Sequence, residues 1–395
     1  MLEAHEIKPN VYWVGALDWN ERLFHGYTTE RGITYNAYLI MDEKVTLIDT
    51  VKEKFSQDLL ARVSQVVDPA KIDYVISNHV EMDHSGALPA VAAACKNATF
   101  LCTTKAKEEF AHHFQEAGID FQAVKTGDTL NIGERTLTFV ETPMVHWPDN
   151  MVTYDEFDKI LFSNDAFGQH FASSQRFDVD VDLCEVMKQA RKYYANIVQP
   201  YGMQASKALE VVKGLSLEMI APSHGIIWTE HIPQILEAYA QWTSNKKVDK
   251  AAIIYDSMWG STEKIAKAIC EGFIQAGLDA RYFDIKATHE SDIVAYTLDA
   301  KYIAVGSPTL NMKMMPNIAM FLTYQNGLSP RNADRVGLAF GSYGWAPVGP
   351  NAVQKELEGA GYKLPQETIT LNWRPTQEDL DTIQEKAFHL AQAQE

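Results

Sequence analysis

The strongest constraint on the fold of this 395-residue chain is the segment YVISNHVEMDHSGALP, residues 74–89. An apolar, strand-like run ends there in four potential metal ligands, His79, Glu81, Asp83 and His84. Four such groups would repel and desolvate one another unless cations were bound. In an extended segment His79 and Glu81 point to the same side, whereas the adjacent Asp83 and His84 diverge. We therefore expect a metal site in which Asp83 or His84 serves a second ion or turns away.

Three further candidate ligands each follow an apolar run later in the chain. They are His146 after FVETPMV, Asp165 after KILFSN and His224 after EMIAPS. Loops at strand ends are where rigid scaffolds present reactive groups. Taken singly, each has a commoner explanation, as a hydrogen-bonded structural histidine or as an aspartate in a turn or helix cap. Together with the cluster they give too many donors for one ion, but they suit two ions that share a bridging carboxylate.

The donor types indicate which metal to expect. Carboxylates and imidazoles in this mixture suit iron or manganese, whereas zinc sites use more histidine and cysteine. Iron would also add redox chemistry. The four cysteines form no CxxC pair, which argues against a disulfide framework, a zinc ribbon or a cysteine-ligated iron–sulfur centre. Such cysteine usage fits a reducing cytoplasm.

A polar segment, TSNKKVDK at residues 243–250, separates two parts of the chain with different patterns. Before it, hairpin-like strand segments mixed with helical ones predict an α+β fold or a layered sandwich. After it, buried apolar runs alternate with helices, which is typical of a doubly wound parallel sheet. We expect two domains, at residues 1–247 and 248–395.

Charge and hydropathy argue against several partners. The formal net charge of −17 leaves no basic stripe for nucleic acid. No apolar run approaches the roughly 18 residues of a membrane span. The acidic, polar N-terminus also lacks the layout of a signal peptide. We expect a cytoplasmic protein that binds neither nucleic acid nor membrane.

Three loops of the second part follow strand-like runs and are rich in small or hydroxylated residues. They are YDSMWGST (255–262), GSPTLNMKMMP (306–316) and GSYGWAP (341–347). The first opens a helix, whose N-terminus can hold a phosphate, and no GxGxxG dinucleotide fingerprint occurs. Alone, such a loop is more often an N-cap, and loop aromatics are more often packing residues. Together at one sheet edge, with Trp259, Tyr343 and Trp345 as flat rings, the loops predict a mononucleotide flavin site.

With both sites in view, the sequence resembles the flavodiiron proteins (A-type flavoproteins) over nearly its whole length. The shared pattern is HxExDH followed by a distant His, Asp and His. Glu81 is the discriminating residue, because hydrolytic relatives usually have histidine there and bind zinc. The resemblance implies a two-domain α/β protein, with an N-terminal metallo-β-lactamase-like αββα sandwich followed by a flavodoxin-like doubly wound parallel sheet.

The resemblance also implies roles for individual residues. One iron would be held by His79, Glu81 and His146, and the other by Asp83, His84 and His224. Asp165 would bridge the two irons. Whether His84 reaches an iron stays open. His25 and Tyr193 match positions near the diiron pocket, where they would donate hydrogen bonds or protons unless their role is structural. FMN would be held by Ser257, Met258, Trp259, Gly260, Ser261, Thr262, Pro308, Thr309, Leu310, Asn311, Ser342, Tyr343, Gly344 and Trp345.

The implied activity is reduction of O₂ to water, of NO to N₂O, or of both, with electrons that reach the diiron centre through FMN. Because no CxxC pairs of a fused rubredoxin are present, the donor would be an external carrier such as rubredoxin. The family forms head-to-tail dimers that bring one subunit's flavin beside its partner's metals, so a homodimer or tetramer is expected. Two alternatives stay open: a two-zinc metallo-β-lactamase-type hydrolase fused to a flavodoxin-like module, and an electron-transfer module with a vestigial metal site.

Overall fold

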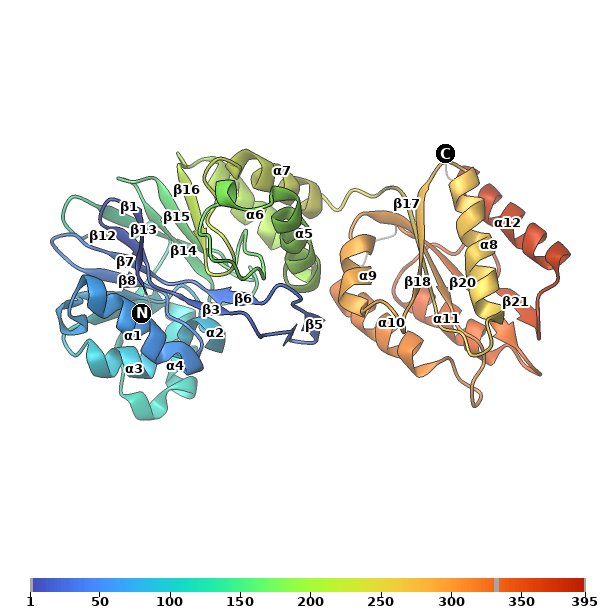
Figure 1. The fold of residues 1–395 in the computed structure, drawn as a ribbon, viewed down its shortest axis with the longest axis horizontal. Coiled ribbons are helices and arrows are strands. Elements are labelled where there is room, and N and C mark those ends of the chain that lie inside the picture. The colour runs from blue at the N-terminus through green and yellow to red at the C-terminus, as the bar shows by residue number, and fades with distance from the viewer. Residues whose placement is uncertain (1–2, 330–333, 394–395) are drawn as a thin grey trace. The chain divides into compact units, whose positions relative to one another are not determined.

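The structure is a computed structural model that describes residues 3–329 and 334–393. The chain divides into two compact units, and Figure 1 shows their elements. The first unit consists of Met1–His25, Thr29–Tyr194 and Tyr201–Thr243. The second consists of Gly26–Thr28, Ala195–Pro200 and Ser244–Glu395.

Two sheets form the centre of the first unit. The larger has the strand order β1 (His5–Lys8), β2 (Val11–Trp13), β7 (Tyr38–Ile40), β8 (Thr46–Ile48), β9 (Tyr74–Ile76), β10 (Thr99–Thr103), β11 (Phe121–Val124). The smaller has the order β12 (Thr129–Asn131), β13 (Thr136–Glu141), β14 (Met151–Asp155), β15 (Ile160–Asn164), β16 (Met219–Pro222). A short ladder joins β3 (Ala16–Asp18) to β6 (Ile33–Tyr35), and the two-residue strands β4 (Leu23–Phe24) and β5 (Tyr27–Thr28) lie between them in the chain.

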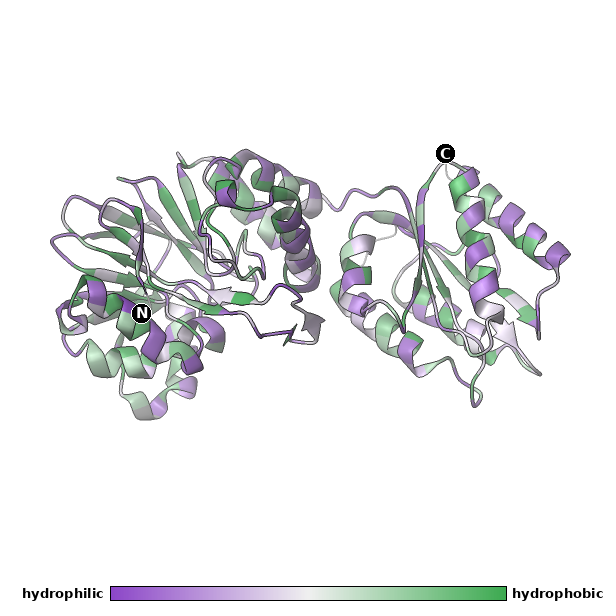
Figure 2. Cartoon of the chain, in the orientation of Figure 1, coloured by the Kyte–Doolittle hydropathy of each residue, from purple (hydrophilic) through white to green (hydrophobic). Residues whose placement is uncertain are grey.

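The two sheets pack face to face on one apolar core. Ile76 and Leu101 of the larger sheet lie in the same buried cluster as Phe139 and Phe162 of the smaller. Burying these faces is the main favourable contribution to folding of such a sandwich. Figure 2 shows the apolar residues concentrated along these strands.

Helices complete the layers of this unit. They are α1 (Ser56–Val66), α2 (Met82–Ser85), α3 (Leu88–Ala94), α4 (Thr104–His113), α5 (Leu183–Tyr193), α6 (Gly202–Lys213) and α7 (Ile232–Thr243). In Figure 1, α1, α3 and α4 gather on the side of β7 and β8, and α6 and α7 on the side of β15 and β16. The predicted αββα sandwich is confirmed.

The second unit is a parallel sheet with helices on both faces. Its strand order is β18 (Asp279–Asp284), β17 (Val248–Tyr255), β19 (Ala300–Gly306), β20 (Val336–Tyr343), β21 (Ile369–Asn372). The helices are α8 (Ser261–Gln275), α9 (Glu290–Thr297), α10 (Pro316–Leu328), α11 (Val348–Gly359) and α12 (Gln377–Gln392). One buried cluster joins the sheet to α8 and α12, and another joins it to α9, α10 and α11. The predicted doubly wound parallel sheet is confirmed, and its ligand-binding edge lies at the carboxyl ends of the strands.

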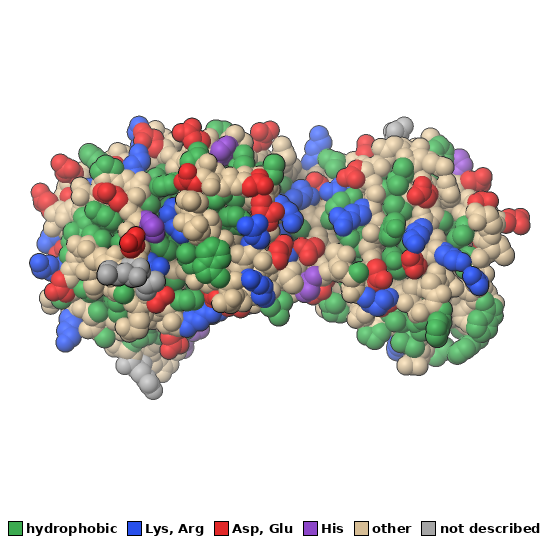
Figure 3. Space-filling model, in the orientation of Figure 1, with side chains coloured by type: hydrophobic (Ala, Val, Ile, Leu, Met, Phe, Trp, Pro, Cys, Tyr) green, Lys and Arg blue, Asp and Glu red, His purple; other side chains and the backbone are tan. Residues whose placement is uncertain are grey.

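The structure pairs none of the four cysteines in a disulfide. All four cysteines are free, and only Cys184 is exposed. On the face shown in Figure 3, acidic and basic side chains are interspersed. None of the helices in the described parts of the chain has the length and apolar character needed to cross a membrane.

Candidate metal centre and loop pocket

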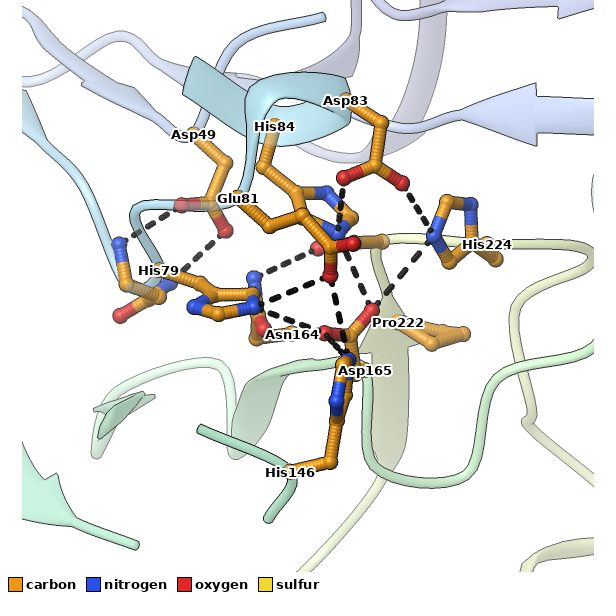
Figure 4. Close-up of polar contacts among 12 residues, drawn as sticks. Asp49, His79, Glu81, Asp83, His84, His146, Asn164, Asp165, Pro222 and His224 are labelled. Carbon is orange, nitrogen blue, oxygen red and sulfur yellow. Dashed lines mark hydrogen bonds and ion pairs between the residues drawn. The ribbon is translucent and has the colours of Figure 1, made fainter. Parts of the chain in front are cut away.

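The candidate ligands of the first unit lie in four loops that each follow a strand. His79 comes after β9, His146 after β13, Asp165 directly after β15 and His224 after β16. One loop therefore belongs to the larger sheet and three to the smaller, and all of them meet at one end of the sandwich (Figure 4). The candidate ligands are all buried: His79, Glu81, Asp83, His84, His146, Asp165 and His224.

The backbone at the HxExDH segment differs from the extended form that the sequence suggested. Strand β9 ends at Ile76, and Met82–Ser85 form the helical turn α2. The expectation that Asp83 and His84 diverge is wrong, because the turn brings His84 Nε2 to 3.4 Å from Asp83 Oδ1. Both side chains face the cluster, as Figure 4 shows.

The ligands form two groups that share one carboxylate. His79, Glu81, His146 and Asp165 form the first group, in which His79 Nε2 and His146 Nε2 lie 3.4 and 3.2 Å from Glu81 Oε2. The second group is Asp83, His84 and His224, with His224 Nε2 3.1 Å from Asp83 Oδ2. Donors around one metal ion lie about 3 Å apart when each is bonded at 2.0–2.2 Å, so both groups have suitable spacing.

Asp165 lies between the two groups. Its Oδ2 is 3.6 Å from His79 Nε2 and 3.5 Å from His146 Nε2. Its Oδ1 is 3.1 Å from His84 Nε2 and 3.5 Å from His224 Nε2. One carboxylate that offers a different oxygen to each group is the arrangement expected of a bridging ligand.

Several ligand atoms have no hydrogen-bond partner, and this observation tests whether the site fits metal ions. Buried atoms with no hydrogen-bond partner among the described residues include His79 Nε2, Asp83 Oδ1 and Oδ2, His84 Nε2 and Asp165 Oδ2. Buried polar atoms are rarely left so, and metal coordination would satisfy them. Burial opposes a charged imidazole, yet Asp83 and Asp165 raise the pKa of His84 to about 9. The buried carboxylates therefore favour positive charge at this site, and the donor set fits two metal ions.

Two imidazoles are oriented by acceptors behind them. His79 Nδ1 lies 2.9 Å from Asp149 Oδ2, which also accepts the Val80 N–H at 2.7 Å. A carboxylate only accepts, so the His79 proton is on Nδ1 and the Nε2 lone pair faces the cluster. In the same way His224 Nδ1 donates to the Thr34 carbonyl at 2.6 Å. Neither Asp149 nor Thr34 was predicted from the sequence to contact a ligand.

Replacing Asp149 by asparagine should weaken metal binding while the fold is retained. The side chain keeps its shape but loses the charge that makes the His79 imidazole a stronger donor to metal. We expect affinity for Fe²⁺ to fall roughly 10- to 100-fold, measured by competition with a chelator. Glu134→Gln, at an exposed carboxylate of the same unit, is the matched control and should bind as the native chain does. Equal affinity in Asp149→Asn and the native chain would contradict the orienting role.

The two residues that were expected near the diiron pocket, His25 and Tyr193, each contact a candidate ligand. His25 Nε2 lies 2.6 Å from Glu81 Oε1, and its side chain is 61% exposed. Tyr193 is buried and donates its hydroxyl to Asp165 Oδ1 at 3.0 Å. His170 was not expected from the sequence, yet its buried ring packs edge-on against Tyr193, with 5.0 Å between ring centroids.

The loops of the second unit enclose a pocket of about 710 Å³ at the carboxyl edge of the parallel sheet. The expected loop residues line it, apart from Gly260 and Thr262. The lining residues are Ser257, Met258, Trp259, Ser261, Pro308, Thr309, Leu310, Asn311, Met312, Ser342, Tyr343, Gly344, Trp345, Ala346, Trp373 and Arg374. A pocket of this size suits a mononucleotide cofactor.

Gly260 and Thr262 shape the first loop instead of lining the pocket. Gly260 has a φ of 82°, a left-handed conformation that glycine adopts without strain, and α8 begins directly after it. The Thr262 hydroxyl lies 3.0 Å from the Ser342 hydroxyl, so it joins the first loop to the third. These contacts direct the α8 N-terminus at the pocket, where backbone N–H groups can bind a phosphate.

A fourth loop, which follows β21, also lines the pocket and was not predicted from the sequence. Its Trp373 and Arg374 line the pocket, and Arg374 is the one charged side chain among the lining residues that the structure describes. The Trp373 ring lies so close to Gly344 that a Cβ there would be 3.1 Å from it. Trp259 and Trp345 are 95% and 83% exposed, so large aromatic rings stand at the pocket mouth. A flat ligand could stack on them.

Comparisons with known proteins find relatives of both units. A family model described as ODP family beta lactamase matches residues 33–225, and the Flavodoxin model matches residues 253–386. A nitric oxide reductase of Moorella thermoacetica is 44% identical over 99% of each chain. A rubredoxin-oxygen oxidoreductase of Megalodesulfovibrio gigas is 40% identical over 99% of this chain and 98% of its own. The crystal structure of the flavodiiron protein from Giardia intestinalis superposes with a TM-score of 0.96 at 35% identity, covering 99% of this chain and 97% of that one.

Proposed function

Because the chain belongs to the flavodiiron proteins, we propose that it is an FMN- and non-haem diiron-dependent reductase of O₂ to water, of NO to N₂O, or of both. It is an oxidoreductase. The observation that carries the proposal is the donor cluster in which Asp165 is shared between two groups and Glu81 stands beside His79 and His146. The relatives favour this function over a two-zinc hydrolase.

The residues described above would hold both cofactors. One iron would lie among His79, Glu81 and His146, the other among Asp83, His84 and His224, with Asp165 between them. FMN would lie in the four-loop pocket, its phosphate at the N-terminus of α8. When bound, the flavin would supply electrons one or two at a time, and the two irons would supply redox chemistry for the reduction.

The chain's own residues would supply protons, which both reductions consume. The Tyr193 hydroxyl, 3.0 Å from Asp165, is a buried O–H group at the ligand set. The exposed His25 contacts Glu81 and connects the cluster with solvent. The Glu81 hydrogen bond raises the pKa of His25 although burial opposes this. His25 and Tyr193 would therefore act as proton donors.

Electrons would come from a separate carrier, most simply rubredoxin, as the name of the Megalodesulfovibrio gigas relative suggests. We also propose a cytoplasmic homodimer or tetramer. Exposed aromatic rings such as Trp259 and Trp345 at the pocket mouth support contact with another protein surface. Light scattering of the holoprotein should give a mass at least twice that of one chain. A fully active monomer would contradict the assembly.

Metal and flavin content test the cofactors. Purified protein should be yellow and carry two irons and one FMN per chain. Two zincs per chain, no iron and no flavin would instead support the hydrolase alternative. Metal analysis together with the flavin absorption spectrum distinguishes the two.

Anaerobic steady-state kinetics test the activity itself. With a reduced donor, the iron- and FMN-loaded protein should consume O₂ or NO, and the ratio of kcat/KM for the two gases gives its preference. A pure electron carrier would turn over slowly or release peroxide. That result would favour the alternative of an electron-transfer module with a vestigial metal site.

A further inference from the structure

Three of the candidate ligands are directly preceded in the chain by a buried polar residue that is not itself a candidate ligand. Asn78 precedes His79, Asn164 precedes Asp165 and Ser223 precedes His224. The side chains of all three preceding residues are buried. Buried amides and hydroxyls are retained where they are hydrogen-bonded, so the partners of these residues are informative.

Asn164 has an unusual backbone conformation. It ends β15 with a φ of 52°, and the parallel pairing with β16 shifts register between Phe162 and Asn164. Asparagine is one of the few residues that adopt this left-handed conformation readily. The register shift and the left-handed conformation together redirect the next side chain, the Asp165 carboxylate that both ligand groups share.

The Asn164 carboxamide connects two further ligand loops. It donates through Nδ2 to Ser223 Oγ at 3.1 Å, directly before His224. Its Oδ1 accepts from Asn150 Nδ2 at 3.1 Å. Asn150 Oδ1 in turn accepts the Trp147 N–H at 2.6 Å, directly after His146. One amide therefore joins the loops that carry three of the ligands.

The remaining ligand loop, that of His79, is held by Asp49. Asn78 donates its backbone N–H to Asp49 Oδ1 at 2.7 Å and its side-chain amide to Oδ2 at 2.9 Å, and Figure 4 shows Asp49 beside this segment. The Asn78 carbonyl also accepts the Met151 N–H at 3.0 Å, and Met151 directly follows Asn150. The His79 loop therefore contacts the chain directly beside Asn150, the partner of Asn164.

We propose that Asn164 is a positioning residue that sets the spacing of the two ligand groups. Its left-handed backbone aims Asp165, and its carboxamide holds the loops of His146 and His224 in register. Fixed ligands lose less freedom on binding metal, which is why outer partners of a metal site affect its affinity. This inference rests on the proposed diiron site.

Two substitutions separate the backbone from the carboxamide. Asn164→Gly keeps the left-handed conformation at no steric cost but removes the amide, whereas Asn164→Ala removes the amide and also strains the backbone. Asn10→Gly is the matched control, because Asn10 is exposed, also has a positive φ of 66° and belongs to the same unit. Ser223→Ala removes one partner of the amide and leaves the backbone of Asn164 as it is.

The test is a titration of the full-length, chelator-stripped chain with Co²⁺ alone, followed by its visible absorption. We expect two ions per chain in the native protein and in Asn10→Gly, with the same spectrum. Asn164→Gly should bind roughly 10- to 100-fold more weakly and show an altered visible spectrum, since ligand geometry determines these bands. Asn164→Ala should bind at least as weakly. Ser223→Ala should be severalfold weaker.

The outcomes distinguish this inference from the proposed function. If Asn164→Gly and Ser223→Ala both match the native affinity and spectrum, the positioning role is refuted while the two-metal site stands. If the native chain itself binds no Co²⁺ and no Fe²⁺, the proposed function fails, and this inference fails with it. If Asn164→Gly does not fold, the Co²⁺ affinity of Ser223→Ala decides the question. A weakened affinity would support the positioning role, and a native affinity would refute it.

Discussion

Replacing His79 by alanine should abolish reduction of O₂ and NO while FMN stays bound. His79 Nε2 lies within reach of both Glu81 and Asp165, so its loss removes a donor from the first group and leaves buried carboxylates uncompensated. The flavin pocket is lined entirely by residues of the second unit, which has its own core. We expect iron content to fall well below two per chain and turnover to be lost with the iron. Metal analysis, flavin absorption and gas-electrode assays measure the three quantities.

The matched control is His112→Ala, at an exposed histidine of α4 in the same unit. It should keep native iron, FMN and activity. Oxygen consumption at the native rate by an iron-depleted His79→Ala protein would refute the role of this cluster. Loss of FMN together with iron would instead indicate that the units do not fold independently.

Replacing Ser261 by glutamate should have the opposite effect, with loss of FMN and retention of iron. Ser261 is the first residue of α8 and lines the pocket. A carboxylate there would repel the phosphate and compete with it for the backbone N–H groups. We expect FMN to bind about 100-fold more weakly or worse, and donor-driven turnover to fall with it. Fluorescence titration of the flavin-free protein measures the affinity.

Riboflavin makes this prediction specific. It lacks the phosphate, so its affinity should change much less than that of FMN. Acidic residues in the first turn favour a helix, so the substitution should not lower the stability of the second unit. An equal loss of affinity for riboflavin and FMN would show that the phosphate does not lie at the α8 N-terminus.

Both folds could be predicted because patterning in the two halves differs so clearly. Continuous apolar runs such as those of β17, β19 and β20 predict a buried parallel sheet, and short strand segments before residue 243 predict a sandwich. The candidate ligands could be named because their chemistry is explicit in the residue types. The ligands lie close together because they follow four strands whose ends converge.

What the sequence could not reveal depends on geometry between distant residues. Asp149 holds His79 across 70 residues, and no pattern distinguishes it from a surface aspartate. The helical turn α2 is too short for periodicity to show, so the direction of His84 was misjudged. Arg374 joins the pocket only because β21 pairs beside β20. Asn164 resembles a turn residue until its amide partners are known.

The convergence of four loops at one end of the sandwich has a consequence for stability. The unit carries no disulfide, because all four cysteines of the chain are free. Two bound ions would tie together loops from His79 to His224, and these ligands come together only in the folded unit. Ions that bind only the native state raise stability with their free concentration. In calorimetry, added Fe²⁺ under anaerobic conditions should raise the melting temperature of the first unit and leave that of the second unchanged.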